Sequence, residues 1–186
     1  MSESDANKEN SGSIVVPRVD ARVLADEIDT LDYSSFIVAP EYIDANGHMN
    51  VGYYTLLFDK ALDLPWARLG IYSQQLLKSG MSSFALETHL TYQRELKLGD
   101  RLQFEFMLLD FDAKRVHYFL QMYHAEQRYL AATCEQISIC MDMRLRRSAS
   151  WSESAMSNIA ALHALHRERP RPAEVGRVIG IRRKSM

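Results

Sequence analysis

Four strand-like segments follow one another with only short joints between them, and this succession constrains the fold of the 186-residue chain more than any other feature. The segments cover 82–95, 101–111, 115–125 and 128–142. Each joint carries turn residues or charge, as at Leu98-Gly99-Asp100. Because parallel neighbours need a crossover of about a dozen residues or more, such short joints predict antiparallel pairing.

A long apolar segment precedes these strands and has the periodicity of a helix. Asn50 is a residue type favoured at helix N-caps, and apolar side chains recur after it at three- and four-residue spacing to about Leu64, where Pro65 ends the pattern. A helix that is apolar on most of its surface must be covered on several sides. The sequence therefore predicts an α+β fold in which a curved antiparallel sheet wraps a long central helix.

The regions on either side have weaker patterns. We expect a disordered tail over 1–13, an arm over 14–32, the main domain over 33–145, and a C-terminal helix and tail over 146–186. The other expected elements are a strand from Tyr33 to Ala39 that Pro40 stops, short and long helices over Tyr72 to Lys78 and Ser150 to Arg169, and an edge strand from Gly176 to Ile181.

Composition limits the compartment and the partners. The net charge is −2, so no overall field attracts nucleic acid or an anionic membrane, and no apolar run approaches the roughly 20 residues that span a bilayer. Cys134 and Cys140 share one strand-like run, too far apart along it to bridge each other, so we expect buried free thiols. No cysteine–histidine pattern indicates a metal site. These features favour a cytoplasmic protein that binds no metal.

The turn-rich segment before the helix carries the most specific motif. It reads Tyr42-Ile43-Asp44-Ala45-Asn46-Gly47-His48-Met49-Asn50-Val51-Gly52-Tyr53-Tyr54, followed by Leu57-Phe58-Asp59. An Asp, then Gly-His, then Asn and an aromatic helix start resemble the signature of the 4-hydroxybenzoyl-CoA-type hotdog thioesterases. The spacing of Tyr92 and Arg94 before Gly99-Asp100 is also similar, and the resemblance covers about residues 33–142. It implies the hotdog fold and hydrolysis of an acyl-CoA thioester, without a cofactor.

The resemblance also implies a chemistry for the start of the helix. Free backbone N–H groups there would receive the thioester oxygen, while Asp44 would act either as the nucleophile, through a mixed anhydride, or as the base on water. His48 either orients the loop or contacts substrate, and Asn50 caps the helix or orders the site. Gly47 supplies a backbone conformation that a side chain would block. The other interpretation of Asp44 is that it only forms the turn.

Two more acids are candidates outside this loop. Strict alternation puts Glu87 and His89 on one face of their strand, with Ala85 and Thr91. That face is either open to solvent or lines the pocket, where Glu87 would bind or activate water and His89 would contact substrate. Asp59 on the helix is the alternative catalytic residue, because another hotdog branch uses a helix acid. A surface ion pair is its other interpretation.

A narrower likeness concerns the acyl group. The runs 87–92, 108–110, 114–117, 122–124 and 131–136 resemble the betainyl-CoA thioesterases of carnitine breakdown, which occur alone or fused to carnitine dehydrogenase. A betainyl group carries a quaternary ammonium, which aromatic faces and a carboxylate bind well. The aromatic candidates, unless they are plain core, are Tyr53, Tyr54, Trp66 and Tyr92.

The resemblance extends to partners. The CoA phosphates need cations, and the candidates are Arg94, Arg128, Arg144 and Arg146. Hotdog proteins pair two sheets edge to edge, so a homodimer or homotetramer is expected, with the acyl-CoA site at the interface. Two other functions remain open: a hotdog dehydratase or hydratase, and a non-catalytic acyl-CoA-binding hotdog protein.

Overall fold

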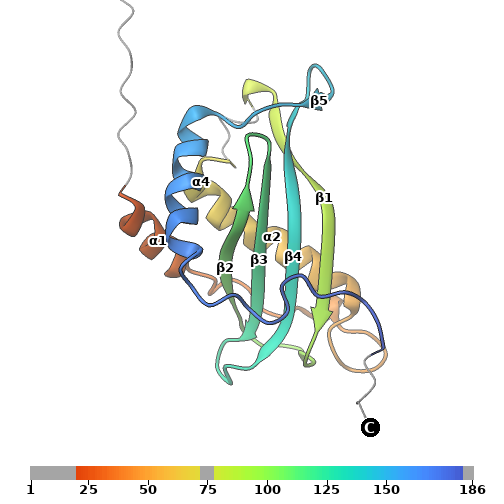
Figure 1. Cartoon of the computed structure of the whole chain (residues 1–186). Coiled ribbons are helices and arrows are strands. Elements are labelled where there is room, and N and C mark those ends of the chain that lie inside the picture. The colour runs from red at the N-terminus through yellow and green to blue at the C-terminus, as the bar shows by residue number, and fades with distance from the viewer. Residues whose placement is uncertain (1–19, 72–77, 182–186) are drawn as a thin grey trace, which may run out of the picture.

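The computed structural model describes residues 20–71 and 78–181 (Figure 1). The helices that it describes are α1 (Ala21–Asp29), the short 3-10 helix η1 (Pro40–Tyr42), α2 (Val51–Leu69) and α4 (Glu153–His166). The strands are β1 (Met81–Tyr92), β2 (Leu102–Phe111), β3 (Arg115–His124), β4 (Leu130–Asp142) and β5 (Arg147–Ser148). The tail expected over 1–13 lies outside the described residues, as does nearly all of the helix expected from Tyr72 to Lys78.

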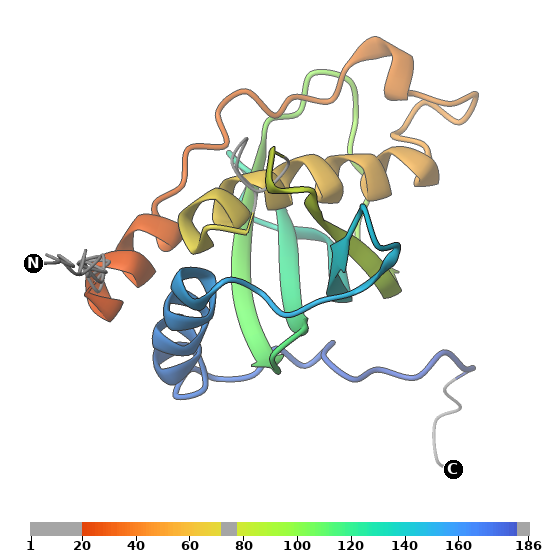
Figure 2. The ribbon, with the colours of Figure 1, turned by 90° about the horizontal axis from the view of Figure 1, so that it is seen from above.

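The strands form one antiparallel sheet in the order β1-β4-β3-β2, with β5 beside β4. Helix α2 lies across one face of the sheet, and the segment after α4 runs along the opposite face (Figure 2). The expected architecture, a sheet wrapped around a long helix, is confirmed. β1 lies at the edge, and its outer side pairs with no strand of the part that the structure describes.

The alternation expected along β1 is wrong at one position. The pairing of β1 with β4 shifts between Ala85 and Glu87, which marks a β-bulge. Ala85 and Thr88 therefore face α2, whereas Glu87 and His89 face the opposite side of the sheet. A bulge inserts one unpaired residue, so the positions before and after it exchange faces.

Helix α2 is longer than its periodicity indicates. Asn50 caps its start as expected, because the Asn50 Oδ1 atom accepts the Gly52 N–H at 3.0 Å. The end expected at Pro65 is wrong: the helix continues through this proline and stops at Gly70, which has a left-handed φ of 76°. Pro65 and Leu69 are buried, and this packing offsets the hydrogen bond that the proline cannot donate.

The core lies between α2 and the inner face of the sheet. Trp66 of α2 packs edge-on against Tyr118 of β3, with ring centroids 4.9 Å apart. Leu24 of α1 and Ile159 of α4 belong to the same buried cluster. Because burying such a side chain contributes about 2 kcal/mol, both flanking helices stabilise the domain.

The strand expected from Tyr33 to Ala39 is not formed. Asp32 Oδ1 accepts the Ser34 N–H at 2.8 Å, and this turn bends the chain at the point where the strand would begin. After the bend, Ile37 alone makes an isolated bridge, to Arg101. Backbone bonds that remain, from the Val38 N–H to the Asp100 carbonyl and from the Leu102 N–H to the Phe36 carbonyl, each at 2.9 Å, do not extend into a strand.

The C-terminal region contains one of its two expected elements. The helix expected over 150–169 is present as α4, which Ser152 caps by accepting the Ala155 N–H at 3.2 Å. The strand expected over 176–181 is absent. Gly176 donates its N–H to the Glu135 carboxylate at 2.6 Å instead of joining the sheet. None of the described helices has the length and apolar character needed to cross a membrane.

Candidate active site

The motif loop, residues 43–49, is a tight hairpin directly before α2. Ile43 and Met49 form an isolated bridge, and the Asp44 N–H donates to the His48 carbonyl at 3.1 Å. Gly47 closes the turn by donating its N–H to the Asp44 carbonyl at 3.0 Å. Its φ of 80° is one that residues with a Cβ rarely adopt, which explains the glycine.

The Asp44 carboxylate is half-buried and takes part in this turn. Its Oδ1 atom accepts the Asn46 N–H at 2.8 Å, while Oδ2 has no partner among the described residues. The side chain of His48 is also half-buried and makes no hydrogen bond within the described part of the chain. Asp44 is thus a turn former, and one of its oxygens remains available to another group.

The first turn of α2 leaves one backbone amide open beside the motif loop. Asn50 uses its side-chain oxygen for the Gly52 N–H and its carbonyl for the Tyr53 N–H, each at 3.0 Å. The Val51 N–H has no acceptor among the described residues, and Val51 is 58% exposed. An open amide at the positive end of a helix dipole favours an oxygen that gains negative charge.

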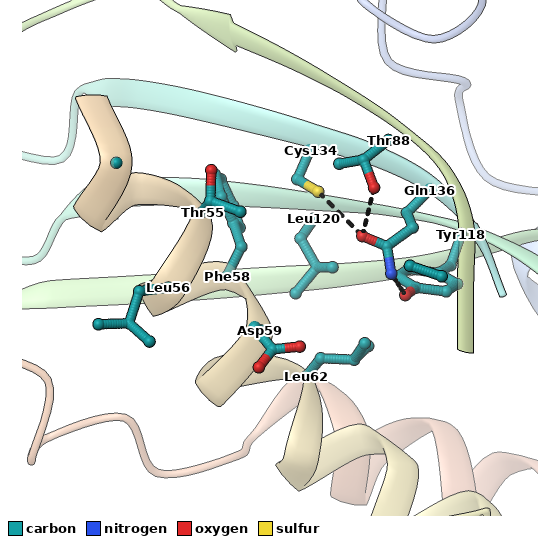
Figure 3. A pocket seen from close by; sticks show the side chains of 12 residues that line it. Thr55, Leu56, Phe58, Asp59, Leu62, Thr88, Tyr118, Leu120, Cys134 and Gln136 are labelled. Carbon is teal, nitrogen blue, oxygen red and sulfur yellow. Dashed lines mark hydrogen bonds between the residues drawn. The ribbon is translucent and has the colours of Figure 1, made fainter. Parts of the chain in front are cut away.

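A cavity of about 430 Å³, here called the α2 pocket, opens between α2 and the sheet (Figure 3). Its helix side consists of Gly52, Thr55, Leu56, Phe58, Asp59 and Leu62. Its sheet side consists of Ala85 and Thr88 from β1, Tyr118 and Leu120 from β3, and Cys134 and Gln136 from β4. Because Gly52 lies in the first turn, the pocket begins near the open amide and extends along the helix.

Gln136 joins the polar groups on the sheet side of the α2 pocket (Figure 3). Its Oε1 atom accepts a hydrogen bond from Thr88 Oγ1 at 2.9 Å, and its Nε2 atom donates to the Tyr118 hydroxyl. Nε2 also donates to Ser138 Oγ at 3.2 Å. These groups satisfy one another. Thr88, Tyr118 and Gln136 are not among the site candidates drawn from the sequence, although polar residues that face inward from strands are a signal for such a wall.

Asp59, on the helix side, differs from these groups. It makes no hydrogen bond or ion pair with any residue that the structure describes, so the ion pair considered for it is not seen there. Its charge acts on its neighbours. The pKa of the Cys134 thiol is raised to about 12, by burial first and then by Asp59. The pKa of Asp63 is likewise raised by burial and then by Asp59.

Glu87 and His89 lie on the opposite face of the sheet from α2. They border a second cavity, of about 280 Å³, together with His117, Glu135 and residues 176–178 of the C-terminal segment. His117 Nε2 lies 2.8 Å from Glu135 Oε1. Within one chain, the structure does not bring Glu87 and His89 together with the motif loop.

The aromatic candidates are divided among separate places. Tyr53 stacks on Tyr42 beside the motif loop, with ring centroids 4.5 Å apart. The buried Tyr54 meets the exposed Tyr92 edge to face at 5.2 Å. Trp66 is buried in the core. The aromatic residues that line the α2 pocket are Phe58 and Tyr118.

The four candidate arginines lie at two ends of the sheet. The Arg94 guanidinium stacks over the Tyr129 ring at 4.0 Å, and Arg128 precedes that tyrosine in the turn between β3 and β4. This is the end at which the motif loop packs, since the Met49 N–H donates to the Leu96 carbonyl at 2.8 Å. Arg144 and Arg146 lie in the turn between β4 and β5.

Comparisons with known proteins agree with this architecture. A sequence profile described as the thioesterase-like superfamily matches residues 38–159. A betainyl-CoA thioesterase from Pseudomonas aeruginosa is 37% identical over 144 residues, which cover 77% of this chain and 91% of that protein. An L-carnitine dehydrogenase/betainyl-CoA thioesterase from Rhizobium meliloti is 29% identical over 142 residues, and the match covers 76% of this chain and 28% of that protein.

Solved structures give the same result. A Staphylococcus aureus protein in complex with CoA shares 30% identity with a TM-score of 0.73, over 79% of this chain and 92% of that one. A putative thioesterase from Pseudomonas putida shares 27% identity with a TM-score of 0.68, over 80% and 94% of the two chains. With a profile that spans most of its length and a relative of this identity, the chain belongs to the thioesterase-like superfamily of hotdog proteins.

Proposed function

We propose that this chain hydrolyses the thioester of a small acyl-CoA to the free acid and CoA, and that betainyl-CoA is its substrate. The observation that carries the proposal is the motif loop, fixed at the open N-terminus of α2 where the α2 pocket begins. The 37% identity to a betainyl-CoA thioesterase supports betainyl as the acyl group, and the CoA complex of a structural neighbour supports coenzyme A as the thiol part of the substrate.

In this proposal the start of α2 polarises the thioester. The carbonyl oxygen accepts a hydrogen bond from the Val51 N–H, and the helix dipole stabilises the negative charge that develops on it. Gly52 leaves space there, because it adds no side chain to the pocket wall. Losing one such donor in other enzymes costs on the order of 3 kcal/mol, so the geometry of this turn is as important as the acid.

Asp44 supplies the second half of the chemistry. As a nucleophile, a carboxylate oxygen bonds to the carbonyl carbon, the carbon–sulfur bond breaks, and CoA leaves as the thiolate, which takes up a proton from the water of the next step. Water then cleaves the mixed anhydride and restores the carboxylate. As a base, the same oxygen takes a proton from the water that attacks the carbonyl. Both branches use Oδ2, which the turn leaves open, whereas Oδ1 holds the Asn46 N–H.

The proposal includes a homodimer or homotetramer in the cytoplasm. The outer side of β1 pairs with no strand among the residues that the structure describes, and exposed apolar side chains lie on β1 and on α2: Val51, Leu56, Phe84 and Leu86. Pairing two β1 edges would cover these side chains and would also protect a strand edge that otherwise invites aggregation. Both cysteines are free, as in a reducing compartment.

A panel of acyl-CoAs tests the reaction class. Purified protein is incubated with acetyl-, betainyl-, 4-hydroxybenzoyl- and 2-enoyl-CoA while a thiol reagent reports free CoA and absorbance reports the enoyl thioester. We expect thiol release, fastest with betainyl-CoA. Loss of the enoyl absorbance without thiol release would favour a hydratase, and CoA binding without either signal would favour a non-catalytic binding protein.

A further inference from the structure

One charged side chain in the α2 pocket has no counterpart. Asp59 lines the pocket without a hydrogen bond or an ion pair to any described residue, and none of the residues that line the pocket is a lysine, an arginine or a histidine (Figure 3). A carboxylate that shares a largely apolar cavity without a partner disfavours anionic ligands and attracts a cation.

The other walls of the pocket determine what kind of cation fits. Thr88 and Gln136 are already hydrogen-bonded to each other, and Gln136 also holds the Tyr118 hydroxyl. A primary ammonium brings three donors, and apart from the Asp59 carboxylate and the Thr55 hydroxyl this wall offers them few acceptors that are not already in use. A quaternary ammonium has no donor and needs only a carboxylate and apolar or aromatic surface, which Asp59, Phe58 and the ring of Tyr118 offer.

The spacing along α2 matches such an acyl group. Val51, whose N–H would hold the thioester oxygen, and Asp59 are eight residues apart, so at about 1.5 Å per residue they lie ~12 Å apart along the helix axis, and the Asp59 side chain tilts back toward the helix start. A hydrogen bond to the thioester oxygen, the carbonyl bond, the two bonds from the carbonyl carbon to the nitrogen, and a methylammonium–carboxylate contact together span about 11 Å, a length that this tilt brings within reach. A betainyl group held at the helix start would therefore place its cationic end beside Asp59.

We propose that Asp59 is the specificity-determining residue of this enzyme, and that its carboxylate binds the quaternary ammonium of a cationic acyl group inside the α2 pocket. This inference rests on the proposed thioesterase function and gives Asp59 a role distinct from that of Asp44. Asp59 is still exposed to solvent in the single chain, and pairing of β1 edges would place a second chain beside the open side of the pocket.

A matched pair of substrates tests the proposal. Betainyl-CoA is compared with 3,3-dimethylbutanoyl-CoA, in which a carbon replaces the nitrogen and the shape is kept. For the wild type we expect kcat/KM to favour betainyl-CoA. In Asp59→Asn the ratio of the two kcat/KM values should fall by roughly 10- to 100-fold, mostly through KM, because the charge partner is lost while the neutral substrate gains from the uncharged wall. Asp59→Glu should restore part of the ratio.

Asp63→Asn is the matched control, because Asp63 stands one turn later on α2 and does not line the pocket. In this variant the ratio of kcat/KM for betainyl-CoA to kcat/KM for 3,3-dimethylbutanoyl-CoA should stay at the wild-type value. If Asp59 were instead the catalytic acid, Asp59→Asn would lower kcat/KM equally for both substrates. The ratio of the two kcat/KM values would then not change, and this result would overturn the proposal.

A binding measurement separates this proposal from the thioesterase assignment. Saturation-transfer NMR follows the methyl signal of the tetramethylammonium ion in the presence of wild type and Asp59→Asn. We expect transfer with the wild type and its loss in the variant, even if no acyl-CoA is turned over. Equal transfer with both proteins, or none with the wild type, would contradict the cation site, whereas absent thiol release alone would contradict only the proposed function.

Discussion

At the scale of single residues, three carboxylates of this chain lie in three different environments. Asp44 shares one oxygen with the turn of its own loop and keeps the other open. Asp59 faces a pocket without any partner among the described residues. Glu87 borders a cavity on the far face of the sheet, under the C-terminal segment. We therefore propose different roles for the three: catalysis for Asp44, cation binding for Asp59, and neither for Glu87, which lies far from the motif loop.

These environments were predictable to different degrees. The turn around Asp44 follows from the local Asn46-Gly47 pair, so the sequence alone indicates it. The isolation of Asp59 depends on which side chains face it from β1, β3 and β4, and no spacing within its helix contains that information. The face that Glu87 shares with its neighbours changes at a bulge, which depends on how β1 pairs with β4.

At the scale of elements, one buried histidine fixes α4 to the sheet. His166 is 1% exposed, and its Nδ1 atom accepts the Leu108 N–H at 2.9 Å. β2 is the outer strand of the sheet on this side, and its pairing with β3 shifts just after Leu108. Burial, and then the positive charge of Arg169, lower the pKa of His166 to about 4. The histidine is therefore a neutral acceptor that joins a helix to a strand irregularity.

This contact predicts a loss of stability in acid. Above pH 6.5 the imidazole is neutral in both the folded and the unfolded chain, so it adds no pH dependence. Below pH 6.5 the His166 imidazole binds a proton in the unfolded chain, whereas in the folded chain it stays neutral until about pH 4. The free energy of unfolding therefore falls as the pH falls. Between pH 7 and 4.5 the titration of His166 lowers the free energy of unfolding by about 2 kcal/mol.

Urea unfolding followed by circular dichroism checks this effect. His166→Asn keeps an acceptor for the Leu108 N–H but does not titrate, so its stability should decline less between pH 7 and 4.5 than that of the wild type. Parallel declines for the two proteins would show that His166 does not carry this pH dependence.

Elements were predicted well where the pattern extends over many residues and poorly where a single contact decides. The four long strands and the start of α2 follow from alternation and capping. The end of α2 does not, because the burial of Pro65 against the core outweighs its local preference to stop a helix. The missing strand at Tyr33 has the opposite cause, because a local hydrogen bond at Asp32 overrides an apolar run there.

At the scale of the whole molecule, the assembly that we propose forms through the edge of β1. Leu86 is 56% exposed on this edge, and Leu86→Asp should yield a folded monomer, because a charge in the paired edge opposes association. Size-exclusion chromatography with light scattering gives the mass. Val23→Asp is the control, since Val23 is 51% exposed on α1, across the molecule from β1 (Figure 1), and should leave the assembly intact. A wild-type mass for Leu86→Asp would exclude pairing through β1.

Whether Asp44, at the open end of α2, drives thioester hydrolysis is decided by the turnover of betainyl-CoA in Asp44→Asn. Asparagine keeps an oxygen for the Asn46 N–H, so the motif loop should retain its turn and the variant should fold and bind CoA as the wild type does. We predict that kcat, measured by thiol release, falls by on the order of 100-fold or more. Turnover equal to that of the wild type would rule out Asp44 as the catalytic carboxylate and leave Asp59 or Glu87 as the candidates for that role.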